Sequence, residues 1–240
     1  MLSILTISSF ITAIISGVLG MGGGILLLSI MTFFLAPTVI IPIHGIVQLA
    51  SNASRVFYLR AHVKKNFFLY YCIGLPLGAL ISVFFLKTLI SDTLIYTALL
   101  VLIFYSVFKP KKMPELKVPA PYWVFIGLMT GILAIIVGAV GPLLAAFFIR
   151  DDFSKEEIVS TKSSMQLVAH FIKIPAFLMM DFNYTEHSTL ILFMSIAVIA
   201  GTKVGVKLLE KVDNSKFKLL FKLVLFIAGL RVGYKLFEVL

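Results

Sequence analysis

Apolar runs of about 20 residues follow one another along almost the whole chain, and this feature restricts the possible folds more than any other. A helix that spans a bilayer needs about 20 mostly apolar residues. Only 13% of the 240 residues are charged, whereas an average soluble domain has about a quarter. The sequence therefore predicts an all-α polytopic membrane protein with about eight to ten membrane segments and excludes a water-soluble enzyme.

The basic residues fit a membrane protein better than a nucleic-acid-binding protein. The formal net charge is +10, but most lysines and arginines fall in short loops between apolar runs, as membrane orientation requires. We expect a multi-pass protein of the cell (plasma or inner) membrane, surrounded by lipid, with no nucleic-acid partner. Neither a cofactor nor a metal site is expected, and the single cysteine, Cys72, cannot form an internal disulfide.

The two halves of the chain resemble each other. Adding 118 to a position pairs Gly20 with Gly138, Gly23 with Gly141, Gln48 with Gln166 and Arg55 with Lys173. Further on, Gly78 matches Gly201 with an offset of 123, which a loop insertion explains. The interpretation is a first transmembrane repeat at 1–108, a basic, proline-rich cytoplasmic linker at 109–121, and a second transmembrane repeat at 122–240.

Each half is predicted to contain one broken segment followed by three whole helices. The breaks are Gly20-Met-Gly-Gly-Gly and Gly138-Ala-Val-Gly-Pro, sequences that do not continue a helix without help from neighbours. The predicted helices are 2–17, 24–35, 38–60, 66–87 and 92–108 in the first half, and 122–137, 142–150, 154–180, 187–209 and 215–237 in the second.

The distribution of basic residues favours halves of opposite topology. If each broken segment turns back to the side it came from, 13 lysines and arginines lie on the cytoplasmic face and 3 outside. If each segment crosses once, the split is 9 to 7. We therefore expect re-entrant-like broken segments and an inverted repeat.

A polar stripe marks one helix of each half. Spacings of 4, 4 and 3 join His44, Gln48, Asn52 and Arg55, and the same spacings join Lys162, Gln166, His170 and Lys173. Residues at these spacings share one face of an α-helix. A charge near the centre of a membrane helix costs about 3 kcal/mol even on the mildest scale, so both stripes should face the protein interior or a water-filled cavity.

The stripes and the breaks together predict an anion site near the membrane midplane, between the two repeats. Glycines let backbone N–H groups approach a ligand, and a half-helix that begins there presents its positive dipole end. Three cations without an acidic partner on either stripe suit an anion. The candidate substrate-binding residues are Gly22, Gly23, Gly24, Gln48, Asn52, Arg55, Gly138, Gly141, Lys162, Gln166, His170 and Lys173. None is expected to be catalytic.

Structural roles are the alternative for most of these residues. The amides and Ser163 could hydrogen-bond between helices, and the glycines could be hinges. Arg55 could anchor the helix at the membrane interface, Lys162 could extend to the surface, and His44 could lie at the periphery.

Each half contains a glycine-containing motif: SGVLGMGGGILLLSIMTFF in the first half, and GILAIIVGAVGPLLAAFF, which continues into STKSSMQLVAHFIKIPAFL, in the second. These motifs resemble the TauE/SafE family of membrane permeases, which are described as sulfite or organosulfonate exporters. The resemblance covers nearly the whole chain and implies transport of small, often sulfur-containing anions. Gly138-Ala-Val-Gly-Pro departs from the glycine run of the first half, so the two breaks need not be equivalent.

We expect a secondary transporter that exports a small oxyanion such as sulfite or a sulfonate, and not an enzyme. A proton or another ion could be coupled, because His44 and His170 are suited to carry protons. Two alternatives stay open at this point: an intramembrane enzyme acting on a lipid phosphate or a peptide bond, with Ser163, Ser164 and His170 as its candidates, and a channel-like anion pathway. The sequence does not give the oligomeric state.

Overall fold

The computed structural model describes residues 1–19, 22–86, 91–108, 117–148 and 152–208, together with 226–227, 229–230, 232–238 and 240. These residues form α-helices and short 3₁₀ or π turns, and no strand occurs among them. The helices are α1 (Leu2–Leu19), α2 (Gly23–Met31), α3 (Pro37–Leu59), α4 (Lys65–Ile81), α5 (Asp92–Phe108), α6 (Trp123–Val137), α7 (Gly141–Phe147), α8 (Lys155–Leu178) and α9 (Ser188–Leu208). The short turns are η1 (Arg60–His62), η2 (Ser82–Leu86), η4 (Ala120–Tyr122) and η5 (Tyr184–His187).

Both predicted breaks interrupt a helix. The first lies between α1 and α2, although Gly20 and Met21 are outside the described residues, and the second lies between α6 and α7. The predicted helix ends at 35 and 150 are too late, because α2 ends at Met31 and α7 at Phe147. The predicted helix at 215–237 and the linker residues 109–116 lie largely or wholly outside the described residues.

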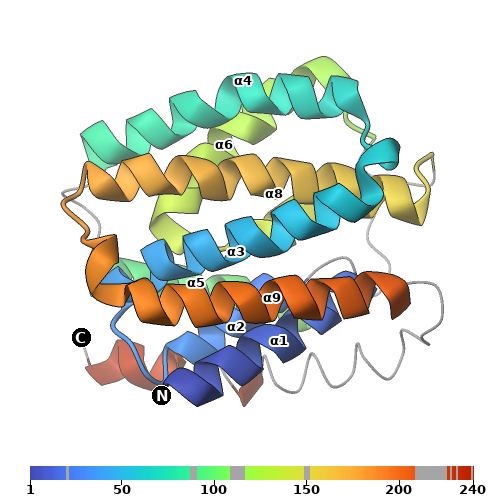
Figure 1. The fold of residues 1–240 in the computed structure, drawn as a ribbon. Helices are drawn as coiled ribbons and strands as arrows, with labels where there is room; N and C mark the ends of the chain where they lie inside the picture. Colours follow the sequence, from blue (N-terminus) through green and yellow to red (C-terminus); the bar gives the residue numbers. More distant parts are fainter. Residues whose placement is uncertain are drawn as a thin grey trace.

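Helices α3 and α8 occupy the middle of the molecule. Figure 1 shows them between the α4–α6 pair on one side and the α1–α9 pair on the other, and α3 packs directly against α8. The most extensive contacts of α4 are with α6, and those of α1 are with α9. The two helices that carry the polar stripes are therefore enclosed by other helices instead of facing lipid.

Small residues let the flanking helix pairs approach closely. A Cβ atom at Gly74 of α4 would lie 1.8 Å from the carbonyl oxygen of Val124, and one at Gly131 of α6 would lie 2.2 Å from that of Leu75. Contacts this short leave no room for a side chain, so the two backbones touch directly. Glycines at such contacts are a common means of packing helices closely in membranes.

Within the described residues, three segments are long and apolar enough to cross a membrane: Lys65–Phe84, Ala120–Val137 and Tyr184–Leu208. Two further apolar helices, Leu2–Val18 and Asp92–Tyr105, are shorter. The central helices α3 and α8 are not in either group. An all-helical chain with these apolar helices is consistent with the predicted membrane protein.

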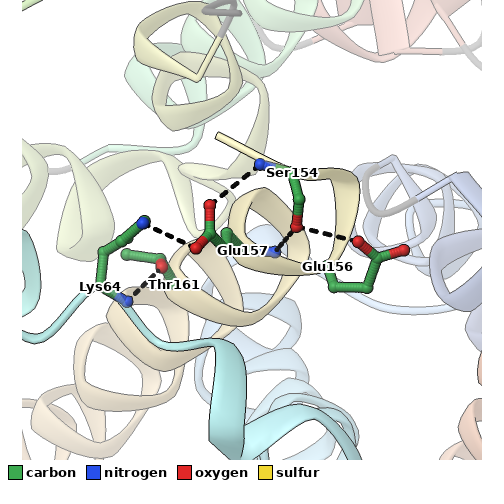
Figure 2. Close-up of polar contacts among 5 residues, drawn as sticks. All are labelled: Lys64, Ser154, Glu156, Glu157 and Thr161. Carbon is green, nitrogen blue, oxygen red and sulfur yellow. Dashed lines mark hydrogen bonds and ion pairs between the residues drawn. The ribbon is translucent and has the colours of Figure 1, made fainter. Parts of the chain in front are cut away.

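The start of α8 is tied to the connection between α3 and α4. Figure 2 shows a capping box, in which the Ser154 hydroxyl accepts from the Glu157 backbone N–H at 3.2 Å and the Glu157 carboxylate accepts from the Ser154 N–H at 3.0 Å. The same carboxylate pairs with the Lys64 ammonium at 2.6 Å, and the Lys64 N–H donates to the Thr161 hydroxyl at 2.9 Å. These contacts fix the register of α8 against α3.

Candidate functional site

A small polar cavity lies where the two breaks meet α3 and α8. Its volume is about 20 Å³, which is room for one or two water molecules. We call it the central cavity. It is lined by Ser16 of α1, by Gly22, Gly24 and Ile25 at the first break, by His44, Gln48, Asn52 and Arg55 of α3, by Ala139 and Gly141 at the second break, and by Gln166 and His170 of α8.

Arg55 supplies a buried positive charge to the central cavity. Only 1% of its surface is exposed, and its guanidinium donates to the Ser16 hydroxyl at 2.9 Å and the Asn52 amide oxygen at 3.2 Å. Longer contacts reach the hydroxyls of Ser163, at 3.3 Å, and Ser51, at 3.5 Å. All four partners are neutral, and no described residue lining the cavity is acidic. A buried cation held by neutral groups beside a cavity suits an anionic ligand.

Two glutamines lie against the two breaks. A Cβ atom at Gly24 would lie 3.3 Å from the Gln48 side-chain oxygen, and one at Gly141 would lie 2.8 Å from the Gln166 side-chain nitrogen. The absence of a side chain at these glycines thus leaves space for an amide at each break. The amides offer hydrogen-bond donors to a ligand in the central cavity.

The backbone at both breaks requires glycine. Gly22, which precedes α2, has φ 91°, and Gly138, which ends α6, has φ 79°. Residues with a Cβ rarely adopt these left-handed angles. Gly22 provides no side-chain cap to α2, so the first N–H groups of this nine-residue helix lie at the cavity without an intrahelical acceptor.

Lys173 does not line the central cavity. It is fully buried, and its ammonium donates to the carbonyl oxygen of Gly138 and to Nδ1 of His170, the latter at 3.3 Å. Its stem passes the backbone of α3 at Gly45, where a Cβ atom would lie 3.3 Å from the Lys173 Cδ. The positive charge therefore sits at the carboxyl end of α6, where the helix dipole is negative.

A family model described as sulfite exporter TauE/SafE matches residues 5–232. The chain belongs to this family. The match confirms the resemblance inferred from the two glycine-containing motifs. TauE/SafE proteins are membrane transporters, and membership together with the apolar helices makes this chain a membrane transport protein. No curated protein and no solved structure matches the chain.

The structure brings eight of the twelve predicted site residues to the central cavity of this TauE/SafE protein. The whole stripe of α3 lines it, including His44, which is buried instead of peripheral. From the stripe of α8, Gln166 and His170 line it. The four residues that do not are Gly23, Gly138, Lys162 and Lys173. Lys162 is 1% exposed, so it does not extend to the surface.

Sequence reasoning missed Ser16, whose hydroxyl accepts the shortest hydrogen bond from Arg55. A serine in an apolar helix is common in membrane proteins, and residue type alone does not distinguish Ser16 from Ser9, whose hydroxyl bonds only its own helix. The proximity of Ser16 to the first break is the one usable signal. No group of three His, Cys, Asp or Glu side chains in the described part of the chain could hold a metal ion.

The glycines at the breaks should respond differently to alanine. At Gly141 and Gly24 the new methyl group would press on the end of a flexible glutamine, which can move, so we expect Gly141→Ala to weaken anion binding with little loss of stability. At Gly23 it would lie 2.1 Å from the Thr12 backbone oxygen, which cannot move without α1. Gly23→Ala should therefore lower the thermal unfolding temperature. Calorimetric affinity and thermal unfolding of Gly24→Ala, Gly141→Ala and Gly23→Ala distinguish these outcomes. Equal unfolding temperatures for all three variants would contradict a packing role for Gly23 that Gly24 and Gly141 do not share.

Proposed function

We propose that this TauE/SafE protein is a secondary transporter that exports a small sulfur-containing oxyanion, such as sulfite or an organosulfonate, through the cell membrane. The observation that carries the proposal is Arg55, a buried guanidinium that lines a polar cavity and is held only by neutral side chains. An unpaired charge in a membrane protein is costly, so its retention indicates a ligand of opposite sign.

The other groups around the central cavity suit the same ligand. Gln48, Asn52 and Gln166 provide amide N–H donors, and the amino-terminal end of α2 provides backbone N–H groups with a positive dipole. A sulfite or sulfonate group has three equivalent oxygens, each of which accepts hydrogen bonds. Donors that converge from α2, α3 and α8 can therefore surround all three oxygens.

The volume of the central cavity indicates a tightly closed state. About 20 Å³ accommodates one or two water molecules, whereas a sulfite ion has four non-hydrogen atoms. Binding thus requires the groups that line the cavity to move apart. A site that opens toward one side at a time is the working principle of secondary transporters, and a cavity smaller than its ligand fits that principle better than a continuously open anion channel does.

Two inverted repeats are the proposed framework for this movement. The starts of α2 and α7, at Gly23 and Gly141, differ by 118 positions, as do those of α3 and α8, at Pro37 and Lys155. Under this correspondence the α4–α6 and α1–α9 pairs exchange places. In Figure 1, α2 packs back along α1, and the connection to α3 leaves near the N-terminus, which supports a re-entrant first segment.

Cysteine accessibility tests the inverted topology. In a Cys72→Ala background, single cysteines at positions 112 and 216, which lie outside the described residues, should react with a membrane-impermeant reagent from the cytoplasmic face. A cysteine in place of Asn183, between α8 and α9, should react from the opposite face. Labelling of positions 112 and 183 from the same face would contradict the inverted repeat and restore a single crossing by each broken segment.

The function itself is tested with purified protein in two steps. A thermal-stabilisation screen should find that sulfite or an organosulfonate raises the unfolding temperature more than phosphate or chloride does. In proteoliposomes, an outward gradient of unlabelled anion should then drive labelled anion inward against its own gradient. Flux that never saturates and never runs uphill would indicate a channel instead of a carrier.

A further inference from the structure

Two histidine rings meet at the central cavity. His44 of α3 and His170 of α8 have ring centroids 5.8 Å apart and planes inclined at 75°, so the edge of one ring faces the other. Both side chains are at most 2% exposed, and both line the cavity. The pair therefore lies where the two stripe helices and the proposed anion meet.

Each ring is bonded to one of the breaks. The Nε2 atom of His44 lies 2.8 Å from the carbonyl oxygen of Gly24, and because a carbonyl only accepts, Nε2 carries the hydrogen. On the other side, the Lys173 ammonium donates to Nδ1 of His170 and to the carbonyl oxygen of Gly138. An ammonium has no lone pair, so Nδ1 of His170 is already occupied as an acceptor.

One nitrogen of this pair has a lone pair to spare. Nδ1 of His44 is buried and has no hydrogen-bond partner among the described residues. With the hydrogen on Nε2, Nδ1 is an acceptor, and a buried acceptor without a donor costs free energy. Histidine exchanges protons near neutral pH more readily than any other side chain. Protonation of Nδ1 would change this unpartnered acceptor into a hydrogen-bond donor.

The charges around the pair are positive. Arg55 lines the same cavity, and Lys173 contacts His170 directly. The helices α2, α6 and α7 contain no ionisable side chain. Tyr71 of α4 is buried with Trp123 in a separate apolar cluster. Lys203 and Lys207 of α9 are exposed. The remaining ionisable groups on the elements that pack against α3 and α8 fall into two sets. Those at helix ends or in turns are Arg60, His62, Lys65, Asp92, Lys155, Glu156, Glu157, Tyr184, Glu186 and His187, and those within helices are Tyr58, Tyr70, Cys72, Tyr96, Tyr105 and Lys162.

We propose that His44 binds a proton at Nδ1 together with the anion, so that anion and proton occupy the transporter as a pair. In the empty cavity a third positive charge would be repelled by Arg55 and Lys173. A bound anion offsets that repulsion and can accept a hydrogen bond from the new N–H. Because such coupling is reciprocal, the proton raises the affinity for the anion by the same factor as the anion raises the affinity for the proton.

The coupled step forms one N–H bond with a proton taken from water on the loading side, and the same bond breaks when the proton is released with the anion. No bond of the anion changes. A monovalent sulfonate and one proton together carry no net charge, so the loaded cavity would gain no charge during transport. This inference rests on the proposed function, because without an anion nothing would draw the proton in.

Calorimetry with methanesulfonate tests the coupling, since this anion keeps a single negative charge at every pH used. Titrations at pH 7.5 in buffers with different ionisation enthalpies give the number of protons taken up on binding. We expect an uptake approaching one proton for the unaltered protein, and an affinity that falls by up to about tenfold for each unit of rising pH. In His44→Gln the side-chain amide can still donate to the Gly24 carbonyl but has no titratable nitrogen. Its uptake should fall close to zero, with an affinity that no longer depends on pH.

The matched control is His62→Gln, which removes an exposed histidine of η1 outside the cavity. It should keep the proton uptake of the unaltered protein. Equal binding heats in all buffers for the unaltered protein, or undiminished uptake in a folded His44→Gln, would overturn the proton proposal while leaving the anion transporter intact. Absence of any binding heat with methanesulfonate and sulfite would instead overturn both proposals. If His44→Gln does not fold, the buffer dependence and pH slope of the unaltered protein still decide.

Discussion

Replacing Arg55 with glutamine is expected to lower the affinity for sulfite or an organosulfonate by about 10- to 100-fold, or about 1.4–2.8 kcal/mol. The variant loses the cation that lines the central cavity, and a hydrogen bond to a charged group contributes about 1.5–3 kcal/mol. Calorimetric titration of the purified protein measures the change. Unchanged affinity in a folded Arg55→Gln protein would remove the observation on which the anion site depends.

Two further variants separate charge from shape at this position. Arg60→Gln removes an exposed arginine five residues further along, at the start of η1, and should bind as the unaltered protein does. Arg55→Lys keeps the charge but replaces the guanidinium that bonds Ser16, Asn52 and Ser163 with a compact ammonium on a shorter side chain. Because a planar fork and a point ammonium are not interchangeable, we expect Arg55→Lys to bind more weakly than the unaltered protein and more tightly than Arg55→Gln.

Replacing Lys173 with methionine is expected to destabilise the protein by about 1.5–3 kcal/mol. Methionine fills much of the space of the lysine stem, but it leaves the Gly138 carbonyl and Nδ1 of His170 without their donor. Thermal unfolding in detergent should therefore show a clear decrease in the unfolding temperature. Anion affinity should fall as well, because Gly138 and His170 position the second break and one wall of the cavity.

The control for this variant is Lys203→Met, which removes an exposed lysine of α9 and should leave the unfolding temperature nearly unchanged. The sequence alone predicts that Lys173 binds the anion directly and that its loss weakens binding while leaving the fold intact. If Lys173→Met unfolds at the same temperature as the unaltered protein but no longer binds anion, that interpretation is correct and the positioning role is wrong.

Much of the fold could be predicted because the signals were local. Apolar runs of membrane length, interrupted by glycines, give both breaks and most helix ends, and the segment 92–108 has the predicted bounds in the structure. Which helices pair could not be predicted in this way. The glycines of α4 and α6 that touch the opposite backbone, such as Gly74 and Gly131, have partners far away in the sequence. A single sequence does not indicate which small residues face each other.

The candidate site, like the fold, could be predicted where the signal is local in the sequence and not where it depends on contacts between distant segments. Helical spacing identified the complete stripe of α3 because every member lies on one face of one helix. The same spacing does not show which groups the Lys173 ammonium contacts. Its long side chain reaches past Gly45 to the end of α6, and the direction of a flexible side chain depends on which carbonyl is nearest in space. Ser16 went unnoticed because its importance comes only from the guanidinium that contacts it.

The pairing of α4 with α6 and of α1 with α9 has a consequence for how the chain is assembled. In each pair one helix comes from before the linker and the other from after it, so the first half has few of its closest packing partners while it is being synthesised. Its helices can enter the bilayer one by one, but their final packing must wait for the second half. We therefore expect the two halves, expressed from separate genes cut at 109–121, to be degraded alone and to reconstitute a working transporter together.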